Sequence, residues 1–250
     1  MTPARDAFLS ELDARAAAGR PLVLWLRDDD AVEPTPALDR LLGLMGALPL
    51  TLAVIPAATG PALARHLAGR QAVSVAVHGW SHRNHAGPVE KSQELGAHRP
   101  AATVLAELGA GARHLSALHG DRALPLLVPP WNRIAPGVIA GLRGAGFAAL
   151  STFGPQARAA GQGLAEVNSH LDIIDWRGTR GGRPAEALWS EALGLARMDL
   201  PALGVLSHHL VHDGAAWAFL EDLVALTASH PGAVWPGVAR IIAKAQDPGS

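Results

Sequence analysis

Two histidines in this chain have a spacing that suits a metal ion. His78 and His82 lie four residues apart in the segment HGWSH. Residues at this spacing share one side of a helical turn, with Cβ atoms ~5–6 Å apart, so both imidazoles could bind one cation. The second position of the segment is Gly79 rather than Glu, which excludes the HExxH signature of zinc proteases. A third ligand must therefore come from elsewhere in the chain.

Carboxylate ligands are available in the triplet Asp28–Asp30, which follows an apolar run. Three adjacent carboxylates repel one another unless a positive group lies close, and a metal ion or Arg27 would relieve that repulsion. Two histidines and one carboxylate leave coordination positions open for water and substrate. The alternative is a solvated strand end that caps the next helix, with the histidines as polar loop residues. We expect the metal site.

The amino-acid composition excludes several kinds of catalysis and metal site, and several kinds of partner. The 250 residues contain no Cys and no Tyr, so disulfides, thiolate catalysis, Cys-ligated zinc and phenol acid/base chemistry are excluded. With 21 basic and 22 acidic side chains, nothing favours nucleic acid or an anionic membrane surface as a partner. The N-terminal segment lacks the continuous apolar stretch of a signal peptide, and no run reaches the ~20 apolar residues of a membrane span. We expect a cytoplasmic protein with no membrane partner.

Short apolar runs alternate with amphipathic segments along the whole chain. The predicted strands are Leu22–Arg27, Leu50–Ile55, Ala72–Val77, Leu124–Val128, Ala148–Thr152, Leu171–Ile174 and Leu203–Ser207. The predicted helices between them are Thr35–Gly46, Pro61–Gly69, Pro100–Gly120, Pro136–Gly146, Pro184–Arg197 and Asp213–Ser229, several of which begin with Pro and end with Gly.

This alternation predicts an α/β fold with parallel strands, either a barrel or an open doubly wound sheet. The barrel is favoured because no GxGxxG segment follows the first strand. We expect a single domain over residues 1–250, with a helix in residues 1–20, a loop at Gly154–Gly163 and a flexible tail over residues 244–250. In such a barrel, polar residues that follow the strands meet at the carboxyl-terminal rim, where active sites lie.

Five short segments that contain these polar residues resemble, in their order along the chain, the motifs of a known family. LRDDDA, HGWSH, VPPWNR, DIIDW and LSHHLVHD resemble the five motifs of the polysaccharide deacetylases, the NodB-homology hydrolases. The resemblance extends from about Leu22 to Leu220. It implies a distorted (β/α) barrel, usually of seven strands, and removal of acyl groups from N-acetylated sugars by a divalent metal held by Asp, His and His.

The resemblance also implies roles for individual residues. Asp29 would be the general base and Asp30 a metal ligand, because Arg27 then stands two residues before the acidic pair. The alternative register makes Asp28 the base and Asp29 the ligand. His78 and His82 match the H-x-x-x-H metal ligands. The expected ion is zinc, with cobalt, nickel, manganese or iron as alternatives.

The last motif supplies the general acid, which the resemblance places at His208 of the L-x-H segment. His209 and His212 are nearby alternatives. The backbone N–H of Trp131 would stabilise the oxyanion. A base and an acid that must act at the same pH predict a bell-shaped pH–rate profile.

One departure from the family pattern concerns an arginine. The family's third motif usually has Arg before the proline, whereas this chain has Val128 before Pro129. Arg27 or Arg133 would replace it by pairing with Asp29 or Asp175, which adds Arg133 and Asp175 to the predicted catalytic residues.

The expected partner is a small-molecule or carbohydrate substrate, and the sequence does not indicate an oligomeric state. Predicted substrate contacts are Trp80, Trp131, Trp176 and Leu206, although ordinary packing also explains the tryptophans. Two other functions use the same residues. One is a non-haem iron oxygenase with the same Asp/His/His site, and the other is a catalytically idle carbohydrate-binding barrel.

Overall fold

The computed structural model describes residues 2–155, 159, 162–198 and 200–247. The helices are α1 (Pro3–Ala17), α2 (Pro36–Met45), α3 (Pro61–His66), α4 (Ala101–His119), α5 (Pro136–Ile139), α6 (Ala185–Ala196), α7 (Gly214–Thr227) and α8 (Val238–Gln246), and single 3-10 turns form η1 (Pro56–Ala58), η2 (Gly120–Arg122), η3 (Pro130–Asn132) and η4 (His209–Val211). None of the helices in these ranges is both long and apolar enough to cross a bilayer.

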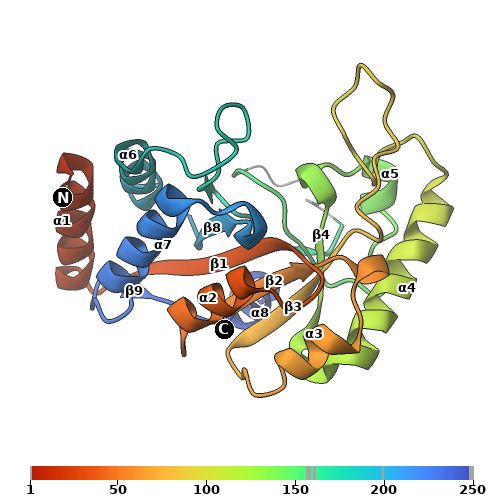
Figure 1. Cartoon of the computed structure of the whole chain (residues 1–250), viewed down its shortest axis with the longest axis horizontal. Coiled ribbons are helices and arrows are strands. Elements are labelled where there is room, and N and C mark those ends of the chain that lie inside the picture. Colours follow the sequence, from red (N-terminus) through yellow and green to blue (C-terminus); the bar gives the residue numbers. More distant parts are fainter. Residues whose placement is uncertain (1, 156–158, 160–161, 199, 248–250) are drawn as a thin grey trace. The chain divides into compact units, whose positions relative to one another are not determined.

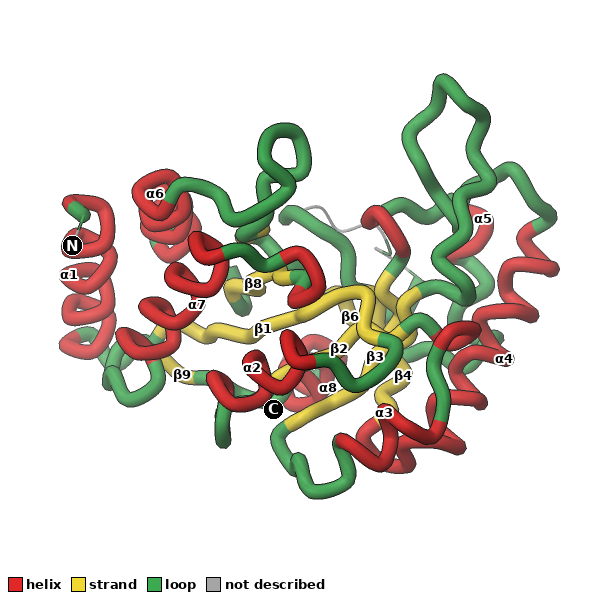
Figure 2. The backbone as a smooth tube through the Cα atoms, viewed as in Figure 1, coloured by secondary structure: helices red, strands yellow, loops and turns green. Residues whose placement is uncertain are grey.

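Nine strands form the sheet within the described ranges. Figure 1 shows these elements in the order of the chain, and Figure 2 colours the helices red and the strands yellow. They are β1 (Leu22–Ala31), β2 (Leu50–Val54), β3 (Val73–His78), β4 (Ala123–Val128), β5 (Ala149–Leu150), β6 (Ala165–Glu166), β7 (Leu171–Asp172), β8 (Leu203–Ser207) and β9 (Ala233–Val234). Their hydrogen-bonded order is β6-β5-β4-β3-β2-β1-β8-β7, and β9 pairs with β1. Every pair whose register is described is parallel. The predicted α/β class, with the parallel strands of a distorted (β/α)7 barrel, is confirmed.

Residue contacts divide the chain into two compact units. The first unit comprises the chain up to Asp28, Thr35–Leu50 and Ser169–Gly237. In it, α1 packs against α6 and α2 packs against α7. The second unit comprises Asp29–Pro34, Thr51–Asn168 and the chain from Val238. There α4 packs on β3 and β4, and α8 packs on β6. The expectation of a single domain stays a prediction.

Side-chain hydrogen bonds cap the N-terminal ends of two helices in the first unit. Thr35 caps α2 by accepting a hydrogen bond from the backbone N–H of Leu38 at 3.0 Å, and Pro36 occupies the first helical position. Asp213 caps α7 by accepting from the backbone N–H groups of Ala215 and Ala216 at 3.0 and 2.9 Å. Such caps satisfy N–H groups that have no partner within the helix.

The predicted boundaries differ from the structure at several places. β1 runs on through the acidic triplet to Ala31, whereas the prediction ended it at Arg27. The helix predicted at Pro136–Gly146 ends at Ile139, and Gly146 follows with a φ of 97°. The predicted tail begins inside α8, which extends to Gln246, and residues 248–250 lie outside the described residues. Part of the predicted loop Gly154–Gly163 also lies outside them.

Candidate metal and catalytic site

Asp30, His78 and His82 come together in the second unit. Their ligand atoms all lie within 4.8 Å of one another. The Nε2 atom of His78 is 3.2 Å from Oδ1 of Asp30, and Nε2 of His82 is 3.4 Å from the same oxygen. Two ligand atoms at about 2.05 Å from one tetrahedral ion are about 3.3 Å apart. The three side chains therefore fit a single divalent ion.

Exposure within this cluster differs from one side chain to another. The His78 side chain is 3% exposed, whereas those of His82 and Asp30 are 24% and 32% exposed. Burial, together with the neighbouring His78, lowers the pKa of His82 and so favours the neutral imidazole that binds metals. The cluster thus has one side within the protein and one side open to solvent.

The loop between the two histidines has an unusual backbone conformation. Gly79 has a φ of 61° and His82 has a φ of 56°. Positive φ is uncommon for a residue other than Gly and persists where the surrounding structure enforces it. The turn lets His78, the last residue of β3, and His82, four residues later, direct their Nε2 atoms at one carboxylate.

Glu94 is the residue that holds this loop. Its side chain, only 1% exposed, accepts hydrogen bonds from the backbone N–H groups of Trp80, Ser81 and His82 at 3.2, 2.8 and 3.3 Å, and from the Ser81 hydroxyl at 3.1 Å. In metal sites, the orientation of the ligands depends on hydrogen bonds made by residues that do not themselves bind the metal. Glu94 is therefore part of the candidate site, although it is not among the residues predicted for the site from the sequence, where its loop is expected to be solvated.

A weak sequence signal for Glu94 is its neighbour Leu95, an apolar residue within a polar loop. Leu95 is fully buried and forms an isolated bridge with Ile134. An apolar side chain at this position indicates that the loop returns to the core there.

Trp131 lies beside the histidine cluster. Its ring centroid is 4.3 Å from that of His82. Both Trp131 and Asn132 have positive φ, 54° and 56°, in the turn that follows Pro129 and Pro130. Next to them, Arg133 donates to the carbonyl oxygen of Ser92 at 2.7 Å. This bond gives Arg133 a partner in the loop, and its catalytic role stays a prediction.

Asp28 has partners different from those of Asp30. It is fully buried in the first unit and accepts hydrogen bonds from the Ser207 hydroxyl at 2.6 Å and from the backbone N–H of His209 at 2.9 Å. Its Oδ1 lies 2.5 Å from Nδ1 of His209. Burial alone would raise the pKa of Asp28, but His209 and the hydrogen bonds hold that pKa below its ordinary value. The next residue, Asp29, is 2% exposed in the second unit.

His208 is half-buried and lies against Trp176 in the first unit. The two rings are edge to face with centroids 4.6 Å apart. The indole N–H of Trp176 donates to Asp172 at 2.9 Å, which fixes the orientation of the indole. Asp175 accepts from the backbone N–H groups of Gly178 and Thr179 at 3.0 and 3.4 Å, so its carboxylate closes a turn. The catalytic role predicted for Asp175 stays a prediction.

The other two histidines of the last motif have different surroundings. His209 is 2% exposed and its Nδ1 atom contacts Asp28. His212 packs edge to face on Trp217 with centroids 4.5 Å apart, and burial lowers its pKa to about 4. The ring of His208 lies against Trp176, a residue of the fourth motif, whereas that of His209 contacts Asp28 of the first.

Two predicted substrate contacts have packing partners. Trp80 is half-buried, and a Cβ added at Gly111 of α4 would lie 3.4 Å from its ring. Leu206 is fully buried in β8. Their contact with substrate stays a prediction.

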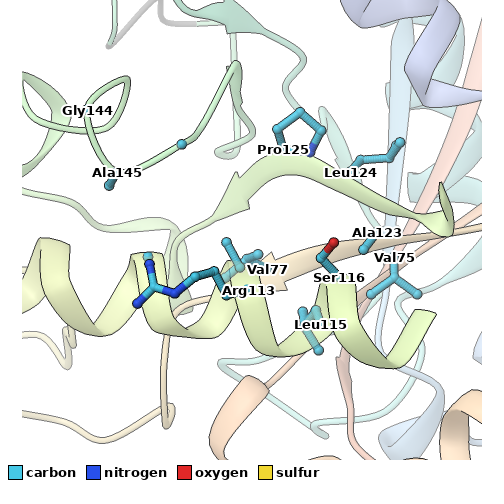
Figure 3. A pocket seen from close by; sticks show the side chains of 13 residues that line it. Val75, Val77, Arg113, Leu115, Ser116, Ala123, Leu124, Pro125, Gly144 and Ala145 are labelled. Carbon is cyan, nitrogen blue, oxygen red and sulfur yellow. The ribbon is translucent and has the colours of Figure 1, made fainter. Parts of the chain in front are cut away.

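A cavity of about 390 Å³ lies elsewhere in the second unit (Figure 3). It is lined by α4, β3, β4 and the turn around Gly144, and Arg113 and Ser116 are among its polar residues. None of the predicted site residues is in its lining.

Comparisons with known proteins identify the fold family of the structure. No protein-family model and no curated protein matches the sequence significantly. The structure matches a protein from Mycobacterium smegmatis classed as a polysaccharide deacetylase, with a TM-score of 0.69 and 18% identity over 92% of each chain. It matches a family 4 acetyl xylan esterase from Clostridium thermocellum in complex with a cobalt ion, with a TM-score of 0.56 and 13% identity over 88% of this chain and 90% of that one. It also matches the chitin deacetylase from Colletotrichum lindemuthianum, with a TM-score of 0.54 and 18% identity over 89% of this chain and 88% of the other. The chain therefore has the fold of the polysaccharide deacetylases and family 4 carbohydrate esterases.

Proposed function

We propose that this protein is a metal-dependent hydrolase that removes an acyl group from an N-acylated sugar or a related small substrate. Acetyl is the first candidate for the acyl group. The observation that carries the proposal is the cluster of Asp30, His78 and His82, in which two imidazole Nε2 atoms lie 3.2 and 3.4 Å from one carboxylate oxygen. The order of the five sequence motifs and the fold shared with deacetylases and esterases support it.

Asp30, His78 and His82 would hold the ion, with zinc first and cobalt, nickel, manganese or iron as alternatives. A divalent ion at these ligands would lower the pKa of water and polarise an acyl carbonyl. The cobalt ion in the acetyl xylan esterase of the same fold is in keeping with this set of metals.

The remaining roles belong to residues of the chain. Asp29, the buried carboxylate next to the ligand Asp30, accepts the proton of the attacking water. His208, a half-buried residue, donates a proton to the leaving amine. The backbone N–H of Trp131, in the turn with positive φ, stabilises the oxyanion. The expected substrate is soluble because we predict a cytoplasmic protein.

The test combines metal analysis with an assay of acyl release. Purified protein should bind one divalent ion and release acetate from N-acetylated amino sugars, and a chelator should abolish the release. Asp29→Asn should keep the metal and lose at least about 100-fold in kcat. Failure of the wild-type protein to bind any divalent ion would overturn the proposal. Turnover that consumes oxygen would indicate the iron oxygenase instead.

A further inference from the structure

The Asp28 carboxylate is hydrogen-bonded to the residues on both sides of His208. Asp28 and Ser207 are register partners on the parallel strands β1 and β8. The Ser207 hydroxyl donates to Oδ2 of Asp28 at 2.6 Å, and the backbone N–H of His209 donates to the same oxygen at 2.9 Å. Nδ1 of His209 lies 2.5 Å from the other carboxylate oxygen. One carboxylate therefore holds the residue before His208 through its hydroxyl and the residue after it through its backbone N–H and its ring.

These contacts are buried, whereas the residue between them is not. Asp28 and Ser207 are fully buried and His209 is 2% exposed, while His208 is half-buried with its ring on Trp176. The backbone N–H of Val211 donates to the carbonyl oxygen of His208 at 3.0 Å and closes the turn that follows. Hydrogen bonds to an ionised carboxylate are stronger than neutral ones, so this arrangement is stiff.

The same geometry argues against a serine nucleophile. In a Ser-His-Asp triad, the hydroxyl donates to the imidazole that serves as its base. Here the Ser207 hydroxyl donates to the carboxylate of Asp28, and the residue is fully buried. The cluster is suited to holding a backbone rather than attacking a substrate.

We propose that Asp28, Ser207 and His209 form a clasp that orients His208, with Asp28 and His209 as positioning residues for proton donation. This inference rests on the proposed function, in which His208 protonates the leaving amine. A proton donor must lie within hydrogen-bonding reach of the leaving atom, and a displacement of about 1 Å can cost about 100-fold in rate. It gives Asp28 a role separate from those of Asp29 and Asp30.

The experiment compares two substrates that differ in their need for an acid. An N-acetyl amine needs a proton on its leaving group, whereas an activated aryl acetate does not. His209→Ala should lower kcat for the amide by about 30-fold or more, with KM, metal content and aryl acetate hydrolysis unchanged. His209→Asn places an amide N–H near the position of Nδ1 and should restore most of the kcat. His230→Ala, which breaks the His230–Asp13 pair of the same unit, is the control and should change neither rate.

A double variant separates orientation from general damage. In a His208→Ala background, His209→Ala should cost nothing further on the amide, because the group that it orients is gone. Equal losses on both substrates, or a full additional loss in that background, would overturn the clasp. If the wild-type protein releases no acyl group, the proposed function fails. Crystal structures of the wild type and His209→Asn and His209→Ala variants then still decide the clasp, because an unmoved His208 ring in the alanine variant contradicts it.

Discussion

The Nδ1 atom of His78 lies 3.0 Å from the carbonyl oxygen of Val128, its register partner on the adjacent strand. A carbonyl oxygen only accepts, so Nδ1 carries the proton and the lone pair of the neutral ring is on Nε2. That Nε2 atom faces Oδ1 of Asp30 at 3.2 Å. Two atoms with lone pairs at this distance are stabilised by a proton or a metal ion between them, which supports the proposed metal site.

The first prediction concerns the ligands. His78→Gln and His82→Gln should each weaken binding of a divalent ion by more than about 100-fold, because each removes one of three protein ligands. Metal content after dialysis and a titration with Zn²⁺ or Co²⁺ would measure it. His85→Gln, in the loop just after the cluster, is the matched control and should bind metal as the wild type does. Unchanged metal binding in both ligand variants would contradict the assignment.

Glu94 should matter to metal binding without being a ligand. Glu94→Gln replaces a carboxylate that accepts three backbone N–H bonds, and we expect metal affinity to fall by about 10- to 100-fold and unfolding free energy to fall by about 1–3 kcal/mol. Zn²⁺ titration and urea unfolding of the metal-free protein would measure the two effects. Glu90→Gln changes an exposed glutamate of the same loop that accepts from the backbone N–H of Gly87 at 2.9 Å, and it should leave the metal affinity unchanged.

Gly79 permits the close approach of Glu94. A Cβ at Gly79 would lie 2.1 Å from Oε2 of Glu94 and 2.6 Å from Pro130, and the residue has a φ of 61°. Gly79→Ala should therefore cost about 3 kcal/mol or more and weaken metal binding. Gly120 also has a positive φ, 58°, with nothing near its Cβ position, so Gly120→Ala measures the cost of a positive φ without crowding, about 1–3 kcal/mol. Similar losses of stability in both variants, measured by urea unfolding, would show that crowding at Gly79 is unimportant.

The sequence predicted the strands best where apolar residues form a continuous run. Leu203–Ser207 has the predicted ends because all five positions are buried, Pro201 stands just before the run and His208 follows it. β1 extends beyond its predicted end because the Asp28 carboxylate has hydrogen-bonding partners inside the protein. The sequence alone shows a charged residue, which is typical of a position outside a buried strand. The short strands β6 and β9 were missed because two residues carry no period.

The candidate site was predictable to the extent that its residues share a short segment or a strand end. The spacing of the histidines and the position of the acidic triplet predicted two imidazoles with one carboxylate, and the family resemblance selected Asp30, which the structure places with His78 and His82. Glu94 was not predicted because its partners lie 12 to 14 residues away along an irregular loop. Such a contact depends on the tertiary path of the chain, which local patterns do not encode.

The last prediction concerns the pH dependence of stability. Burial lowers the pKa of His170 to about 4, and its Nδ1 atom accepts a hydrogen bond from the backbone N–H of Gly204 at 3.1 Å, which protonation would break. The unfolded chain takes up this proton near pH 6.5, so between pH 6.5 and about 4 the unfolded state holds more protons. Stability should therefore fall as the pH is lowered through this window, by at most about 2 kcal/mol from this residue between pH 6.5 and 5. His170→Asn keeps an acceptor for Gly204 but does not titrate. Urea unfolding at pH 7 and pH 5 should show a smaller loss of stability in this variant than in the wild type, and equal losses would rule out His170 as the cause.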